Sequence, residues 1–504
     1  MSELLIRADA STNIGGGHLM RCLALAQGWK GEDGTATFLS HCESDGLLQR
    51  IESAGLNFVS IEKPYPDASD LQRTLVLLDQ LTTSQAAGVW LVLDGYHFDS
   101  TYQQAIRSAG HRLLVIDDMA HLRRYHADLL LNQNIHAERL SYCCDSDTEF
   151  LLGTDYVMLR PEFQPWRGWK REIPETPSKV LISLGSSDPE NVALRVIQAL
   201  QQTGTNGFEV RIAVGPTNPN LETLQQAIAR STNMQLLVDV TYMPEQLAWA
   251  DVAISAGGTT CWESAFMGLP SIVIVLAENQ AGIAQSLDEA GAVVNLGWHE
   301  HVSGKGLSDG LEKLLHSVDL LHDMSRRGQE IVDGEGVGKV ISEIKKRSIK
   351  LRAVSTDDCR LVWEWANEPD ARASSFSSEV ISWGQHAKWF ETKVHDSQCL
   401  YYIALDFAGE PIGQVRYDLR EDEAVISVSL DAKSRGNGYG SLIIKQASDQ
   451  VFDVALVKTI HAYVKKGNEA SVHAFAKAGY KEKSMTAVRG QEAHHFILTT
   501  DRLK

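Results

Sequence analysis

Cysteine is scarce in this chain of 504 residues, and its seven cysteines form no C-x-x-C pair. An odd, scattered set does not fit a disulfide framework, and structural zinc sites commonly bring their cysteines in close pairs. The cysteine usage therefore predicts reduced thiols, as in cytoplasmic proteins.

Positive charge in excess and long apolar runs are also lacking. The formal net charge is −18, from 47 basic and 65 acidic residues. Nucleic acids and anionic membranes reward basic surfaces, so neither is expected as the main partner. No apolar run reaches the roughly 18 residues of a membrane span, and the N-terminus shows a strand pattern instead of a basic, apolar leader. We expect a cytoplasmic protein with small-molecule partners, and the oligomeric state stays open.

The chain is too long for one hydrophobic core and should divide into about three domains. Apolar strands alternate with helical patterns in residues 1–165 and again in 175–340, on either side of a proline-rich linker. Strands separated by helices of this length form right-handed crossovers in a parallel sheet. We therefore predict an α/β fold with two tandem Rossmann-like domains, 1–165 and 175–340.

The last part of the chain has a different sequence pattern. A basic stretch, Lys345-Lys346-Arg347, precedes it, and its strand patterns alternate between apolar and polar residues as antiparallel strands do. We place a boundary near residue 350 and predict an α+β domain over 350–504.

Three glycines, Gly15-Gly16-Gly17, and His18 lie between the opening strand and a helix that begins near Leu19. Such a turn gathers unpaired backbone N–H groups at the positive end of a helix, which suits a phosphate or a polarised sugar oxygen. An imidazole there can serve as a general base, as a donor to an anion, or only as a polar cap. Taken alone, a glycine-rich turn with an incidental histidine explains the motif equally well.

A second glycine motif starts at Gly185, where Ser186, Ser187 and Asp188-Pro189 follow a strand. Small residues let the backbone approach a ligand, the serines can donate to phosphate oxygens, and the proline suits the first turn of a helix. An ordinary helix cap is the alternative.

A third motif runs from Gly257-Gly258-Thr259 to Glu263, again from a strand into a helix. A diphosphate fits the helix end, and the Glu263 carboxylate can accept both hydroxyls of a ribose. Three such strand-to-helix turns in the two halves favour a nucleotide ligand over coincidence.

These halves resemble the GT-B glycosyltransferases that use UDP-sugars, and more closely the UDP-sugar hydrolases of pseudaminic acid biosynthesis. The resemblance covers roughly residues 3–335. The similar stretches are Arg7–Ser11, Gly15–Cys22, Leu93–Tyr96, Ile116–Asp118, Asn132–Asn134, Leu159–Phe163 and Ala277–Gln280.

The resemblance implies that water displaces UDP from a diacetamido-trideoxy-altropyranose with inversion at the anomeric carbon. It places the general base on His18 and UDP mainly on the second half, and no metal is required. Asp94 is predicted to be catalytic or to contact the sugar, although a capping role stays open. The predicted substrate contacts are Gly17, Arg21, Tyr96, Gly185, Ser186, Gly257, Gly258, Thr259, Glu263, Asn279 and Gln280.

Asn279 and Gln280 begin a helix that is predicted to face the sugar-binding site, with helix capping as the alternative to sugar binding. Four further histidines are predicted to be surface or packing residues: His97, His111, His121 and His126.

In the last domain, the spacing Arg435-x-x-Gly-x-Gly follows an alternating strand and leads into a helix, with glycines at 436, 438 and 440. Successive backbone N–H groups there can bind a pyrophosphate. Together with the helix that begins at Asn468 and ends at Gly479, this pattern resembles the GNAT acetyltransferases. The resemblance implies acetyl-CoA as co-substrate, held by Arg435, Gly436, Gly438 and Gly440, with Asn468 as a further contact.

The GNAT resemblance leaves the acid and base open. Many members carry a tyrosine acid where Phe475 stands here, so Tyr480, water, or unassisted loss of the thiolate remain. The acceptor side is predicted at residues 363–367 with His386 and Trp389, against packing or surface placement as the alternative. This stretch resembles an amino-sugar N-acetyltransferase of the same pathway, which implies a fusion of consecutive steps.

Two other functions fit the sequence. The chain can be a UDP-sugar glycosyltransferase fused to an acetyltransferase, which would bind an acceptor hydroxyl in place of water. It can also be a nucleotide-sugar binding protein without turnover. Release of UDP from a UDP-sugar alone separates the hydrolase from both.

Overall fold

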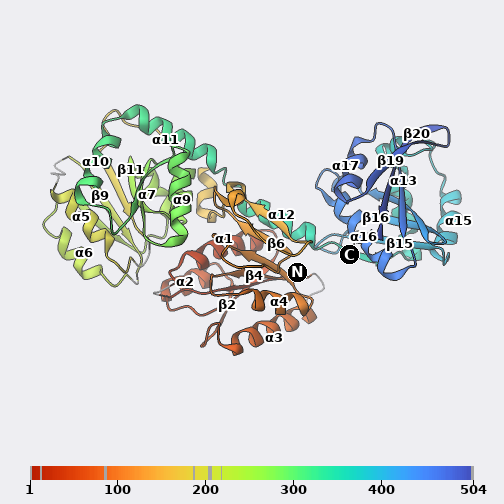
Figure 1. The fold of residues 1–504 in the computed structure, drawn as a ribbon, viewed down its shortest axis with the longest axis horizontal. Helices are drawn as coiled ribbons and strands as arrows, with labels where there is room; N and C mark the ends of the chain where they lie inside the picture. Colours follow the sequence, from red (N-terminus) through yellow and green to blue (C-terminus); the bar gives the residue numbers. More distant parts are fainter. Residues whose placement is uncertain are drawn as a thin grey trace. The chain divides into compact units, whose positions relative to one another are not determined.

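The computed structural model describes residues 3–11, 14–84, 88–185, 188–202, 207–216 and 218–500. It divides into a first unit, Met1–Ile341, and a second unit, Ser342–Lys504. Figure 1 shows the second unit in blue. Within the described part of the chain, every helix is too short or too polar to cross a membrane.

The first unit begins with a parallel seven-stranded sheet in the order β3-β2-β1-β4-β5-β6-β7. Its central strands β1 and β4 are buried along their whole length, because helices cover both faces of the sheet. The strands are β1 Glu3–Ala8, β2 Thr35–Ser40, β3 Asn57–Ser60, β4 Val89–Asp94, β5 Arg112–Ile116, β6 Leu129–Asn132 and β7 Glu149–Leu152. The helices are α1 Gly17–Gly31, α2 Asp45–Ser53, α3 Ala68–Ser84 and α4 Ser100–Ser108.

A second parallel sheet follows in the order β10-β9-β8-β11-β12-β13. Its strands are β8 Lys179–Ser183, β9 Glu209–Val214, β10 Met234–Val238, β11 Val252–Ala256, β12 Ser271–Val275 and β13 Val293–Trp298. Its helices are α5 Val192–Gln202, α6 Leu221–Ile228, α7 Met243–Trp249, α8 Thr260–Phe266, α9 Glu278–Glu289, α10 Gly304–Leu315 and α11 Val318–Ile331. Short 3-10 turns join the sheets and loops at Ala137–Arg139, Thr154–Tyr156 and Pro161–Trp166. The two Rossmann-like sheets agree with the prediction.

One local prediction in this sheet is wrong. Helix α5 begins at Val192, so Pro189 lies in the turn before the helix and not in its first turn. The Asp188 carboxylate accepts hydrogen bonds from the backbone N–H groups of Val192 and Ala193, at 2.9 and 2.8 Å. The Asp188 carboxylate therefore caps the helix, and Pro189 lies in the turn that leads into it.

The connecting helix α12, Gly336–Arg347, packs on the first sheet's helix α1. A β-carbon added at Gly28 would lie 2.4 Å from Val337 Cγ1 and 3.2 Å from Ile341 Cδ1. The start of α12 therefore contacts the first Rossmann-like domain, although the sequence places it at the end of the second.

The second unit is built on a mostly antiparallel sheet in the order β14-β15-β16-β17-β18-β20-β19. Strands β17 and β18 run parallel, and their pairing covers only residues 423–425 and 459–461. The strands are β14 Lys350–Ala353, β15 Cys399–Leu405, β16 Pro411–Arg420, β17 Glu423–Leu430, β18 Thr459–Lys465, β19 Lys481–Val488 and β20 Gln491–Thr499. The helices are α13 Cys359–Asn367, α14 Pro369–Ser374, α15 Trp383–Val394, α16 Tyr439–Val454 and α17 Glu469–Lys477, with 3-10 turns at Thr356–Asp358 and Ala432–Ser434.

Two apolar clusters hold the second unit together. The larger joins one face of the sheet to α16 and α17, and the smaller joins the other face to α13 and α15. This α+β arrangement is the one predicted for residues 350–504.

Candidate active site

A cavity of about 570 Å³ in the first unit is lined from both parallel sheets. Its lining residues follow the carboxyl ends of the strands, where open parallel sheets bind their ligands. The volume is in the range of sites for ligands of cofactor size.

His18 is held at the amino end of α1 by a buried carboxylate. His18 Nδ1 lies 2.7 Å from Asp94 Oδ1, at the end of β4, and the Asp94 side chain is 0% exposed. A carboxylate only accepts, so Nδ1 donates to Asp94, and in the neutral ring the lone pair is then on Nε2. His18 itself is 8% exposed and lines the cavity. The pair therefore suits the role of a base.

Arg21, one turn further along α1, ties this pair to a second aspartate. Its Nε and Nη2 donate to the two oxygens of Asp94, both at 2.7 Å, and its Nη1 donates to Asp118 at 2.9 Å. Burial alone would raise the pKa of Asp94, but the Arg21 guanidinium and His18 outweigh it and hold that pKa well below its ordinary value. Asp94 is thus a fixed anion behind the histidine.

Asp118 connects this cluster to the second sheet through Tyr96. The Tyr96 hydroxyl donates to Asp118 at 2.5 Å and accepts from Asn279 Nδ2 of α9 at 2.9 Å. Asn134 Nδ2 also donates to Asp118, at 2.7 Å. A chain of hydrogen bonds therefore runs from α9 to the histidine.

Neither Asn279 nor Gln280 caps its helix, so the capping alternative is wrong. Ala277 occupies the N-cap position of α9. Gln280 Oε1 accepts from the backbone N–H of Leu276 at 3.0 Å and so holds the end of β12. A β-carbon on Gly257 would lie 3.0 Å from Gln280 Cβ, so a larger residue there would push α9 away.

Glu263 lies in α8 and lines the cavity, but it already has a partner. Arg160 Nη2 donates to Glu263 Oε1 at 2.9 Å, and Arg160 also pairs with Glu162 at 2.7 Å. A ribose hydroxyl would therefore meet a carboxylate that an arginine orients.

Most predicted substrate contacts line this one cavity: Gly17, Arg21, Tyr96, Gly185, Gly258, Thr259, Glu263, Asn279 and Gln280. Asp94 lies behind His18 and outside the lining, and Gly257 is also outside it. Ser186 falls outside the described residues. Asp118, Asn134 and Arg160 also line the cavity, and each lies in one of the stretches that resemble the hydrolases. The prediction left Asp118 open between a cap and a sugar contact, and it gave Asn134 and Arg160 no role of their own.

His121 is exposed, as predicted, yet it also supports the site. Its Nδ1 lies 2.9 Å from Asp117 Oδ2 and its Nε2 lies 3.1 Å from the Tyr96 carbonyl. A hydrogen bond to Asp117 raises the pKa of His121. The histidine thus helps to hold the loop that carries Tyr96.

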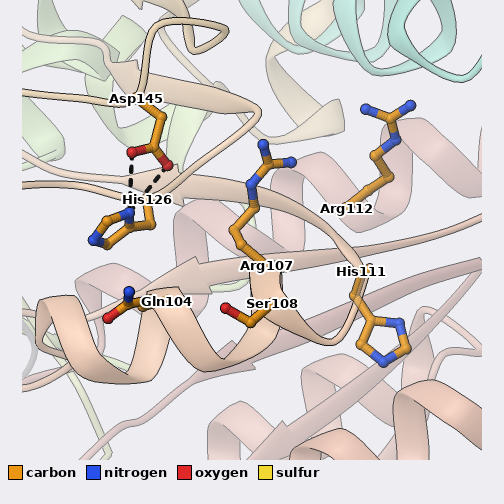
Figure 2. A pocket seen from close by; sticks show the side chains of 8 residues that line it. Gln104, Arg107, Ser108, His111, Arg112, His126 and Asp145 are labelled. Carbon is orange, nitrogen blue, oxygen red and sulfur yellow. Dashed lines mark hydrogen bonds and ion pairs between the residues drawn. The ribbon is translucent and has the colours of Figure 1, made fainter. Parts of the chain in front are cut away.

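A second hollow, of about 550 Å³, lies at the opposite edge of the first sheet, near the start of β5 and β6. Figure 2 shows His126 bonded to Asp145, with Gln104, Arg107 and Ser108 on α4. Its arginines are neutralised, since Arg107 pairs with Asp147 and Arg112 with Asp128, both at 2.8 Å. Both arginines of this hollow therefore have acidic partners.

No group of three or more histidine, cysteine, aspartate or glutamate side chains is arranged to hold a metal ion in the ranges that the structure describes.

The glycine loop of the second unit leads into α16, and its arginine side chain already has partners within the protein. Gly436 and Gly438 both adopt φ +80°, and Gly438 is the N-cap of α16. The Arg435 guanidinium pairs with Glu368 and donates from Nη2 to the Leu430 carbonyl at 3.1 Å. The loop can therefore offer backbone N–H groups, while the arginine side chain braces it.

Asn468 serves as a helix cap, because its Oδ1 accepts from the Ser471 N–H at 3.1 Å. Gly479 follows the C-cap of α17 with φ +95°, as predicted.

Two side chains with open roles in this unit are buried. Tyr480 is 4% exposed, its hydroxyl bonds to Ser448 Oγ at 2.8 Å, and burial raises its pKa. It packs in the core beside Phe475. His386 is also buried, which lowers its pKa, and its Nε2 lies 3.1 Å from the Cys359 carbonyl. The expectation of surface placement for His386 is wrong.

The aromatic stretch of the predicted acceptor side is partly core. Trp365 is buried and its Nε1 donates to Asp431 at 3.1 Å, while Trp363 Nε1 donates to the Ile381 carbonyl at 2.8 Å. Trp389 is exposed, and Glu364 pairs with Arg360 on the surface.

Two Rossmann-like sheets around one cavity, joined to an α+β acyltransferase-like unit, define the class of this protein. Residues 179–335 match the glycosyltransferase family 28 C-terminal domain, and residues 348–481 match the acetyltransferase (GNAT) domain. The predicted fold class, a GT-B-like pair followed by a GNAT domain, is confirmed.

Relatives of the first unit agree with the predicted resemblance. The chain is 24% identical to the UDP-2,4-diacetamido-2,4,6-trideoxy-beta-L-altropyranose hydrolase of Campylobacter jejuni, over 57% of this chain and 97% of that protein. It is 23% identical to the spore coat polysaccharide biosynthesis protein SpsG of Bacillus subtilis, over 66% of this chain and 95% of that protein. A Methanocaldococcus jannaschii protein is 19% identical over 95% of this chain and 97% of its own length. The resemblance to a UDP-sugar hydrolase followed by a GNAT domain is confirmed.

Proposed function

We propose that the first unit hydrolyses a UDP-linked diacetamido-trideoxy sugar to UDP and the free sugar, with inversion. We propose further that the second unit is an acetyl-CoA-dependent amino-sugar N-acetyltransferase of the same cytoplasmic pathway. The observation that carries the first proposal is the His18–Asp94 pair at the cavity edge, opposite the glycine-rich turns of the second sheet.

In the proposed reaction, His18 Nε2 takes a proton from water while the water oxygen bonds to the anomeric carbon. The bond from that carbon to the UDP oxygen breaks, and UDP leaves with the electron pair. Because water enters opposite UDP, the configuration inverts. Asp94 keeps the other nitrogen protonated and stabilises the imidazolium that forms.

UDP leaves readily only if hydrogen-bond donors stabilise its negative charge. Backbone N–H groups at the start of α8, after Gly258, can donate to the diphosphate. Glu263 would accept from the ribose, and Asn279 or Gln280 would contact the sugar. Their place in the cavity lining supports these roles.

Arg21 acts through the two aspartates and is a positioning residue in this proposal. It is buried, and removing one partner of a buried ion pair costs about 3–5 kcal/mol. Its substitution would report unfolding before chemistry, so His18 is the better residue to test.

A UDP-sugar glycosyltransferase is the second candidate, favoured by the match of residues 179–335 to a glycosyltransferase domain. The test is incubation of the full chain with the UDP-sugar alone, followed by chromatography for UDP and free sugar. Release of both supports hydrolysis, whereas release only with a hydroxyl acceptor supports the transferase. Tight binding without release would favour a binding protein.

For the second unit, the amine nitrogen of the acceptor would bond to the thioester carbonyl carbon of acetyl-CoA and lose one proton to solvent. The bond from that carbon to sulfur would break, and CoA would leave as thiolate. Tyr480, water, or loss of the thiolate without an acid would complete the step. Mass spectrometry after incubation with acetyl-CoA and the UDP-4-amino sugar tests this. Gain of one acetyl group on the sugar supports it, and an unchanged sugar contradicts it.

A further inference from the structure

A lysine from the connecting helix lies beside the glycine loop of the second unit. A β-carbon added at Gly438 would lie 3.9 Å from Cε of Lys346. Lys346 is in the last turn of α12, just before the residues 348–481 that match the acetyltransferase domain. The lysine therefore approaches the loop from outside the matched segment.

The end of α12 is anchored to the second unit. Ile349 is part of its larger apolar cluster, and Gln446 Nε2 of α16 donates to the Ile349 carbonyl at 3.3 Å. Ser348 Oγ donates to the Ile344 carbonyl at 2.7 Å, which closes the last turn. Packing thus fixes Lys346 near Gly438.

The charges around the loop favour a ligand role for this lysine. The Arg435 guanidinium is already bound to Glu368 and to the Leu430 carbonyl. Lys346 Nζ pairs with Glu343 Oε1 at 2.6 Å, and an ammonium group has three donors, so one ion pair does not use them all. The Lys346 side chain is 22% exposed and can reach a ligand at the loop.

We propose that Lys346 is a phosphate ligand of acetyl-CoA and donates from Nζ to the pyrophosphate that loop 435–440 holds. This inference rests on the proposed acetyltransferase function. The helix that connects the two units thereby completes the co-substrate site of the second unit.

The test is Lys346→Gln in the full chain, with acetyl-CoA and 3′-dephospho-CoA titrated by calorimetry. Both ligands keep the pyrophosphate, so we expect Kd to rise about tenfold for each, as loss of a charge-assisted contact does. UDP-sugar hydrolysis should not change.

Two variants serve as controls. Glu343→Gln breaks the same ion pair but keeps the ammonium group, so it should bind acetyl-CoA like the parent. Lys458→Gln removes an exposed lysine that pairs with Asp422, and it should also leave Kd unchanged.

Parent-like binding by Lys346→Gln would overturn the inference. So would equal weakening by Glu343→Gln, because the effect would then come from the ion pair. A loss seen with acetyl-CoA but not with 3′-dephospho-CoA would move the contact to the 3′-phosphate and overturn the pyrophosphate assignment. Failure of the parent chain to bind acetyl-CoA would instead reject the acetyltransferase function itself.

Discussion

At the scale of single residues, the proposed base depends on a carboxylate 76 positions away in the sequence. Replacing His18 by Ala or Asn removes the proton acceptor but leaves the second sheet's UDP contacts in place. We expect hydrolysis to fall by about two to four orders of magnitude with UDP binding nearly unchanged. Steady-state kinetics and UDP titration measure the two effects, and turnover near the parent rate would remove His18 from the mechanism.

We expect a different effect for Glu263, because a contact to the ribose stabilises the ground state and the transition state equally. Glu263→Ala should raise KM for the UDP-sugar and leave kcat close to the parent value. The matched control is Glu162→Ala, which removes the other acidic partner of Arg160. A lower kcat with unchanged KM would contradict the ribose role.

At the scale of elements, the turn before α16 allows little besides glycine at position 438. With φ +80°, a β-branched residue there is strained, and its side chain would also occupy the space above the loop N–H groups. Gly438→Val should abolish measurable acetyl-CoA binding while UDP-sugar hydrolysis continues. Calorimetry and a UDP assay on the same preparation decide this, and acetyl-CoA binding at parent strength would place the co-substrate elsewhere.

Acid should destabilise the first unit at the carboxyl ends of β1, β4 and β5, where three buried aspartates lie. Burial would raise the pKa values of Asp9, Asp94 and Asp118, yet hydrogen bonds and the charges of Arg7, Arg21 and neighbouring histidines lower them, for Asp9 to about 2. Because the unfolded chain takes up these protons first, the stabilisation is present above about pH 4 and is lost as pH falls toward 2.

Urea denaturation followed by circular dichroism measures that loss. The unfolding midpoint of the first unit should drop steadily between about pH 4.5 and pH 3. A midpoint that is constant over this range would show that the carboxylates are not held as the structure shows them.

At the scale of the whole molecule, the two units should work apart. A fragment of residues 1–348 keeps all of α12 and should hydrolyse the UDP-sugar, because its cavity is lined only by the first unit. Residues 349–504 should fold but bind acetyl-CoA more weakly than the full chain, because they lack Lys346. If the first fragment is folded by circular dichroism and does not hydrolyse, the modular interpretation is wrong.

Local patterns in the sequence determined most of the secondary structure and the fold class of this protein. Alternating strand and helix periods gave the two parallel sheets, and β-type alternation gave the last domain, because periodicity depends only on neighbouring residues. Glycines at strand ends marked the turns that line the cavity and the turn before α16 for the same reason.

The tertiary structure alone decided which charges meet. Strand β1 neighbours β4, with Ala8 opposite Asp94, and this order brings residues 18 and 94 together. The Tyr96–Asn279 bond joins residues 183 positions apart, and Lys346 reaches Gly438 only through packing of α12. Strand order and helix packing follow from the burial of the whole chain, so no local motif carries them.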